Sequence, residues 1–133
     1  MRFLRQDIEA VKAMLFIQEN RDLLDDADCI LVERQPPMGF KDIEALIMHQ
    51  FRSKVKLISP NRLHKFFKIG HLDYEKRKER TVEIASPWVE HIPTFESNVR
   101  KHDMADAMCL VLYFIAKVPI WNLRYFIFGF MLF

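Results

Sequence analysis

Two short apolar runs separated by one helical segment constrain the fold of this chain most strongly. Residues 29–32 (CILV) have the length of a buried strand, and residues 54–59 (KVKLIS) alternate in polarity before Pro60. Between them, the apolar side chains of residues 42–51 recur at helical spacing. A strand, a helix and a second strand in this order predict parallel pairing through a right-handed crossover. The sequence therefore predicts an α/β domain.

The segments around this unit are expected to be mainly helical. Residues 6–24 form an amphipathic pattern that ends at Asp25 and Asp26, and a final helix is expected from Ser97 or Asn98 to about Ala116. Between the second strand and that helix we expect a short basic helix within residues 61–69 and a charged, solvated stretch at residues 71–80. Two strands are few for an open sheet, which usually has about five or six. Part of the domain is therefore expected to be missing.

Composition indicates one folded domain. The chain has 133 residues, half of them hydrophobic, and a net charge of only +2, so its overall charge says little about partners. Cys29 and Cys109 lie in apolar runs without a metal-binding or disulfide spacing, which is typical of buried free thiols in a reducing compartment. The N-terminal residues are amphipathic and charged and do not resemble a signal peptide, so we expect an intracellular protein.

The C-terminal residues 110–133 are mostly apolar and need separate consideration. Lys117, Pro119 and Arg124 interrupt the run, whereas a membrane-spanning helix needs roughly 20 apolar residues with few charges. We therefore expect the domain to cover residues 1–116. Residues 117–133 are expected to be an apolar tail that folds back or packs on a partner, although a small membrane-associated protein is an alternative.

Three carboxylates are candidates for a catalytic site. Glu33 directly follows the first predicted strand, and Asp103 and Asp106 are three residues apart, so they project from nearly the same face of the final helix. An oxygen-rich set of this kind suits Mg²⁺ or Mn²⁺, and pairs of such ions catalyse phosphoryl transfer. The alternative is a solvated first helical turn, in which acidic residues are favoured by the helix dipole.

The order of four motifs resembles a known family. The segments ILVERQ, GFKDIEALIMHQF, KVKLISPNRLHKFF and KHDMADAMCLVLYF are similar to the RuvC-like Holliday junction resolvases of the ribonuclease H-like superfamily, of the type found in poxviruses, other large DNA viruses and mitochondria. Glu33 and Gln35 match a catalytic Glu followed closely by Gln, and Ser59 with Pro60 matches a strand that ends in Ser-Pro. The last motif is a D-x-x-D pair preceded by His, which His102 begins.

The resemblance implies a fold and an activity. The fold would be a ribonuclease H-like mixed sheet flanked by helices, and the activity would be Mg²⁺- or Mn²⁺-dependent cleavage of four-way DNA junctions by a homodimer at sites of viral or organellar DNA replication. Glu33, Asp103 and Asp106 would be metal ligands, and His102 would assist proton transfer or orient water, unless it is only a capping or surface residue. The family begins with a strand that carries a further Asp, and this chain begins at the helix after it. We therefore expect an N-terminally incomplete domain with impaired cleavage, or a catalytically inactive DNA-binding or interaction module.

Basic residues concentrate between Arg52 and Arg80. The predicted phosphate contacts are Lys54, Lys56, Arg62, Lys65 and Lys68. Phe66 and Phe67 lie among them and have the chemistry to stack on an unpaired base. The alternative is an ordinary solvated surface that covers buried phenylalanines. The run at residues 76–80 is more typical of a solvated loop, although in a junction-binding protein it would reach a duplex arm.

Overall fold

The computed structural model describes residues 2–37, 41–92, 101–117 and 125–128. Its elements follow one another in the order α1 (Arg2–Glu19), α2 (Arg21–Asp26), β1 (Cys29–Glu33), α3 (Lys41–Gln50), β2 (Val55–Ile58), α4 (Pro60–Phe66), α5 (Tyr74–Val89), α6 (Lys101–Lys117) and β3 (Tyr125–Phe128). The predicted strand–helix–strand unit corresponds to β1, α3 and β2. The chain is an α/β domain, as the sequence predicted.

The sheet has three strands in the order β2-β1-β3, and β1 is parallel to both neighbours. Ile30 lies beside Val55 in one pair and beside Phe126 in the other. The predicted parallel crossover from β1 to β2 is therefore confirmed. The first four residues of β1 are buried, because a central parallel strand is covered on both faces, and this explains its continuous apolar sequence.

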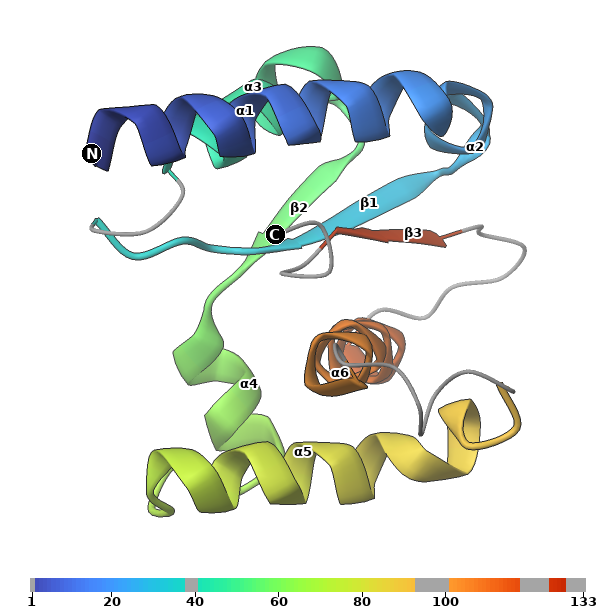
Figure 1. Ribbon diagram of the computed structural model, residues 1–133. Coiled ribbons are helices and arrows are strands. Elements are labelled where there is room, and N and C mark those ends of the chain that lie inside the picture. Colours follow the sequence, from blue (N-terminus) through green and yellow to red (C-terminus); the bar gives the residue numbers. More distant parts are fainter. Residues whose placement is uncertain (1, 38–40, 93–100, 118–124, 129–133) are drawn as a thin grey trace.

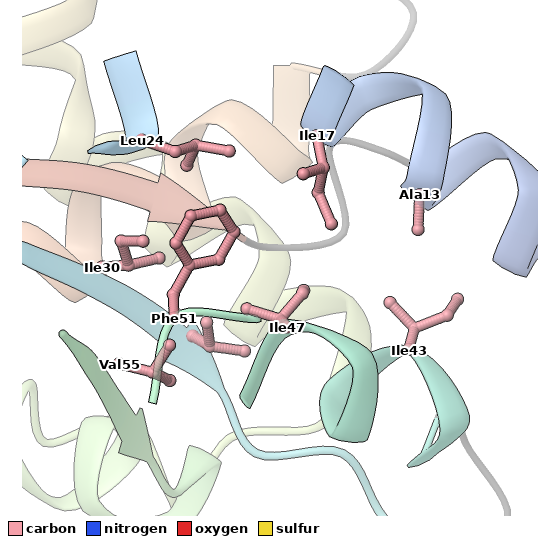
Figure 2. Close-up of a cluster of buried hydrophobic side chains, with 9 residues drawn as sticks. Ala13, Ile17, Leu24, Ile30, Ile43, Ile47, Phe51 and Val55 are labelled. Carbon is pink, nitrogen blue, oxygen red and sulfur yellow. The ribbon is translucent and has the colours of Figure 1, made fainter. Parts of the chain in front are cut away.

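Helices cover both faces of the sheet (Figure 1). On one face, α1 and α3 pack over β1, and their contact is a core cluster that includes Ala13, Ile17, Ile30 and Ile47 (Figure 2). On the other face, α6 packs against β1 through Leu31 and Leu110, and α5 lies beyond α6. α6 lies between the sheet and α5 and is covered on two sides. This explains why residues 107–114 are almost all apolar.

The first helical segment is divided in two. The predicted helix of residues 6–24 is interrupted at Asn20, whose side-chain amide donates to the carbonyl of Phe16 at 2.9 Å, and α2 then continues through Asp25 and Asp26. The expected end of the helical segment at these aspartates is therefore confirmed, because α2 ends at Asp26, whereas the interruption at Asn20 was not predicted. The ammonium group of Lys54 binds the carbonyl oxygens of Leu24 and Asp25 and thereby satisfies the end of α2.

Residues 71–80 are largely exposed, as expected for a charged, solvated stretch, but the expectation of a loop at residues 76–80 is wrong. Residues 74–89 form the helix α5, whose first turn is capped by Asp73: its Oδ1 accepts a hydrogen bond of 2.9 Å from the backbone N–H of Lys76. Thr81, Ala85 and Val89 recur every four residues and are buried against α6. The exposed charges that suggested a loop are the outer face of this helix.

The apolar tail contributes to the sheet. Residues 125–128 form β3, which pairs with β1 in parallel, so residues 117–133, predicted to fold back or to pack on a partner, do fold back at this point. α6 ends at Lys117, one residue beyond the expected end, while its expected caps at Ser97 and Asn98 lie outside the described residues. Within the described ranges, no helix has both the length and the apolar character needed to cross a membrane.

Candidate functional site

A cleft of about 980 Å³ lies where the carboxyl ends of β1 and β2 meet α4, α5 and α6. In parallel α/β sheets, ligands characteristically bind at this edge, because the loops that follow the strands diverge there. β1 leads into the cleft with Glu33, Arg34 and Gln35, and β2 is followed by Pro60 and Asn61 at the start of α4. The volume is within the usual range for small-molecule and cofactor sites.

The three predicted carboxylates line this one cleft. Glu33 is the last residue of β1, and Asp103 and Asp106 project from the first turns of α6. The alternation of buried Ala105 and Ala107 with half-buried aspartates directs α6 so that its acidic side borders the cleft. Packing of α6 against β1 thus brings Glu33 to the same cleft as the two aspartates, which follow it by about seventy residues in the sequence.

The cleft is an unfavourable place for two of these charges. Burial raises the pKa of Asp106 from 3.8 to about 6, with a further contribution from the charge of Asp103 and a smaller opposite one from Lys78. Burial also raises the pKa of Glu33 from 4.5 to about 7, and the charge of Asp106 adds to this rise. The charge of Asp106 opposes the ionisation of Glu33, so the cleft disfavours the state in which both carboxyl groups are ionised.

Two buried polar atoms at the cleft have no hydrogen-bond partner in the described part of the chain: Nδ1 of His102 and Oε1 of Gln35. The Gln35 side chain donates from Nε2 to the carbonyl of Glu33 at 3.1 Å, which fixes its orientation because only the amide nitrogen is a donor. The backbone N–H of Gln35 donates to a carboxylate oxygen of Glu44 at 2.7 Å. Both unsatisfied atoms are available to a ligand, since a buried polar group without a partner is costly.

The donor chemistry of the carboxylates fits a hard divalent cation, and their mutual repulsion is the force that a cation would relieve. In the described residues, however, no group of three or more His, Cys, Asp and Glu side chains is already arranged as a metal-binding cluster. The site thus has the ligand types for Mg²⁺ or Mn²⁺ without a closed coordination shell. Glu33 and Asp106, which interact directly through their charges, are its central pair.

The basic residues chosen from the sequence lie elsewhere. Lys54 binds the end of α2, and none of the predicted phosphate contacts is among the residues that line the cleft. Of the remaining four, all exposed, Lys56 lies in β2, Arg62 and Lys65 on α4, and Lys68 in the loop after it. Phe67 borders the cleft, whereas Phe66 packs edge-on against Tyr113, with ring centroids 5.4 Å apart.

Other cations line the cleft itself. Arg77 and Lys78 on α5 border it from one side, and Lys41 at the start of α3 borders it from another. Nη1 of Arg77 donates to the carbonyl of Leu72 at 2.9 Å, and Nζ of Lys78 lies 5.0 Å from the ring centroid of Tyr74. The sequence analysis considered that the run at residues 76–80 could reach a duplex arm, but it assigned the run to a loop and did not place Arg77 and Lys78 beside the carboxylates. The helix α5 could have been recognised from Asp73 as its N-terminal cap and from the four-residue spacing of its buried positions.

Comparison with known proteins identifies no relative: no protein-family model matches the chain, and neither any curated protein nor any solved structure shows significant similarity to it.

Proposed function

We propose that this chain is a ribonuclease H-like domain that hydrolyses phosphodiester bonds of four-way DNA junctions with Mg²⁺ or Mn²⁺. The observation that carries the proposal is the meeting of Glu33 and Asp106 in one cleft, with their pKa values raised to about 7 and about 6. Two ionised carboxylates held close together in this way lower the stability of the folded state unless a cation lies between them. They lie at the edge of the sheet where α/β proteins bind ligands. The β1–α3–β2 crossover and the Ser-Pro that follows β2 agree with the motif order of the resolvases that the sequence resembles.

In this proposal each group at the cleft has a defined task. Glu33, Asp106 and Asp103 would hold the cations, and the chemistry that bound cations would supply there is activation of water and stabilisation of the leaving oxygen. Lys78 and Arg77 border the same space and attract the negatively charged strand toward the carboxylates. His102, whose Nδ1 has no partner within the described residues, exchanges a proton with the attacking water or with the leaving group.

The test is cleavage of a fluorescently labelled four-way junction with Mg²⁺ and, separately, with Mn²⁺. The chain supplies three of the four carboxylates that the resemblance implies, so we expect slow cleavage, because metal-assisted displacement depends on a complete ligand geometry. Glu33→Gln and Asp106→Asn should abolish that cleavage, whereas Glu79→Gln, an exposed change on α5, should leave it unchanged. Cleavage that persists in the first two variants would contradict the assignment of the site.

A second candidate function is a DNA-binding module without cleavage. It is favoured by the lack, among the described residues, of a preformed cluster of three metal ligands. In that case the chain should bind the junction and never cut it with either cation. Binding should weaken as salt rises, because contacts to phosphates release counterions.

Two substitutions on α5 distinguish DNA bound in the cleft from DNA bound along the outer surface of the helix. Lys78 borders the cleft, and Lys76 is exposed two residues earlier on the same helix. Lys78→Gln should weaken junction binding and reduce the slope of log affinity against log salt by about 0.9, the value for one phosphate contact on duplex DNA. Lys76→Gln should change neither. The opposite result would mean that DNA follows the outer surface of α5 rather than the cleft.

A further inference from the structure

Glu44 on α3 holds two groups that belong to the cleft, although it is not among the described residues that line it. Its side chain is only 12% exposed, and its two carboxylate oxygens have different partners. Oε2 accepts a hydrogen bond of 2.7 Å from the backbone N–H of Gln35, and Oε1 accepts one of 3.3 Å from Nζ of Lys41. Both partners line the cleft. One carboxylate therefore joins the end of β1 to a cation at the cleft.

The bond to Gln35 fixes the backbone that carries Glu33. A hydrogen bond of 2.7 Å to an ionised carboxylate is at the short end for such pairs, which are roughly twice as strong as neutral ones. One residue earlier, the backbone N–H of Arg34 donates to the carbonyl of Ile58 at 2.9 Å and extends the pairing of β1 with β2. The segment after Glu33 is therefore held by the sheet and by α3 together. The direction in which the Glu33 side chain leaves the backbone depends on both.

The ion pair with Lys41 fixes a cation. Lys41 is the first residue of α3, and its side chain is 43% exposed, so its ammonium group would otherwise move among many rotamers. Glu44 lies three residues later, where side chains of a helix are neighbours. An ammonium group has three N–H donors, and Glu44 accepts from one of them. The other donors of Lys41 can serve a phosphate oxygen of a strand in the cleft.

We propose that Glu44 is a positioning residue, which sets the place of Glu33 relative to Lys41, and so of a metal ligand relative to a phosphate contact. The inference rests on the proposed function, in which Glu33 holds a cation, and it adds Lys41 to the residues that contact DNA. Residues that orient a metal ligand without touching the metal typically contribute about 10- to 100-fold to metal affinity or activity. A displacement of about 1 Å at a reacting centre has a similar effect.

Glu44→Ala removes both contacts, and three other variants separate them. Glu44→Gln keeps an oxygen that can accept from the N–H of Gln35 but loses the charge that holds Lys41. Lys41→Met removes the ion pair alone. Asp42→Asn is the matched control, because Asp42 is an exposed acidic residue in the first turn of the same helix. Far-UV circular dichroism verifies that each variant is folded, and Glu44→Asp, which is too short to keep both contacts, replaces Glu44→Ala if that variant is not.

Calorimetric titration with Mn²⁺ alone measures the effect on Glu33 without DNA and without turnover. Glu44→Ala should weaken Mn²⁺ binding by about 10- to 100-fold. Glu44→Gln should recover most of this loss, because the hydrogen bond to Gln35 is what holds the segment after Glu33. Lys41→Met and Asp42→Asn should bind Mn²⁺ as the wild type does. A role limited to fold stability predicts instead the same Mn²⁺ affinity in every variant that is folded.

Cleavage kinetics with the labelled junction separate the two contacts of Glu44. Lys41→Met and Glu44→Gln should each raise KM by about two- to fivefold, as expected for one exposed charge pair, and leave kcat nearly unchanged. Glu44→Ala should raise KM by a similar factor and also lower kcat by about 10- to 100-fold, because Glu33 is displaced as well. Asp42→Asn should change neither constant.

These results distinguish an error in this inference from an error in the proposed function. If the wild type binds Mn²⁺ and cuts the junction, but folded Glu44→Ala does both equally well, the positioning role is wrong and the proposed function stands. The positioning role is also wrong if Glu44→Gln binds Mn²⁺ as weakly as Glu44→Ala, or if Asp42→Asn has the same effect as either. If the wild type neither binds Mn²⁺ nor cuts the junction, the proposed function is wrong, and the positioning role fails with it.

Discussion

Removing the charge of Glu33 should stabilise the protein, and the size of the gain should depend on pH. The folded state raises the pKa of this carboxyl group from 4.5 to about 7, first through burial and then through the charge of Asp106. The folded protein therefore holds the proton more tightly than the unfolded chain does between these two pH values. By linkage, the stability that is fully present below about pH 4.5 is lost progressively as the pH rises to about 7.

The magnitude follows from the shift. Each pKa unit corresponds to about 1.4 kcal/mol, so ionised Glu33 costs about 2 to 3 kcal/mol once its partial exposure is allowed for. Glu33→Gln keeps the shape of the side chain and removes the charge. We therefore expect its free energy of unfolding to exceed that of the wild type by about 2 to 3 kcal/mol at pH 8 and by almost nothing at pH 4.

Urea unfolding at a series of pH values, with a chelator present, measures this difference. Glu79→Gln on the exposed side of α5 is the control, and its effect should stay within about 0.5 kcal/mol at every pH. Adding millimolar Mg²⁺ at pH 8 should stabilise the wild type and leave Glu33→Gln unaffected if the carboxylates bind the cation. A gain that is equal at pH 4 and pH 8, or a loss at pH 8, would refute the electrostatic reasoning.

Three other predictions concern the core, a helix end and a buried thiol. Leu110→Ala should lower the free energy of unfolding by about 2 to 5 kcal/mol, because Leu110 is 1% exposed, whereas Ile115→Ala on the exposed side of the same helix should cost less than about 1 kcal/mol in the same urea titrations. Lys54→Met should lower the free energy of unfolding by about 1 to 3 kcal/mol, because the carbonyls at the end of α2 lose their cation. Lys56→Met, at an exposed position two residues later, should be nearly neutral. Equal effects would contradict the structural role of Lys54. Burial raises the pKa of the Cys109 thiol to about 12, so its reaction with a disulfide reagent at pH 8 should be at least about 100-fold slower in the native protein than in urea, and rapid native labelling would show that the helix opens.

Local patterns were sufficient to predict the central unit of the fold. The apolar run at residues 29–32, the helical spacing of residues 42–51 and the stop at Pro60 each report on their own backbone. Together they indicate a parallel crossover, because a helix between two strands is the usual connection of a parallel pair. The spacing of Asp103 and Asp106 likewise defined one face of α6. The position of Glu33 at a strand end followed from the end of the apolar run.

Only the tertiary structure decided how these parts meet. Packing placed Glu33 and Asp106 at one cleft and brought cations of α5 to the border of that cleft. It also paired residues 125–128 with β1. Each depends on contacts between segments far apart in the chain, and the free energy of such contacts is not encoded in any single window of sequence. Lys54 illustrates the reason: its charge suggested a phosphate contact, but two carbonyls that no local pattern could place beside it hold its ammonium group instead. A charged side chain binds whatever partner the fold brings within reach, and that partner is set by packing.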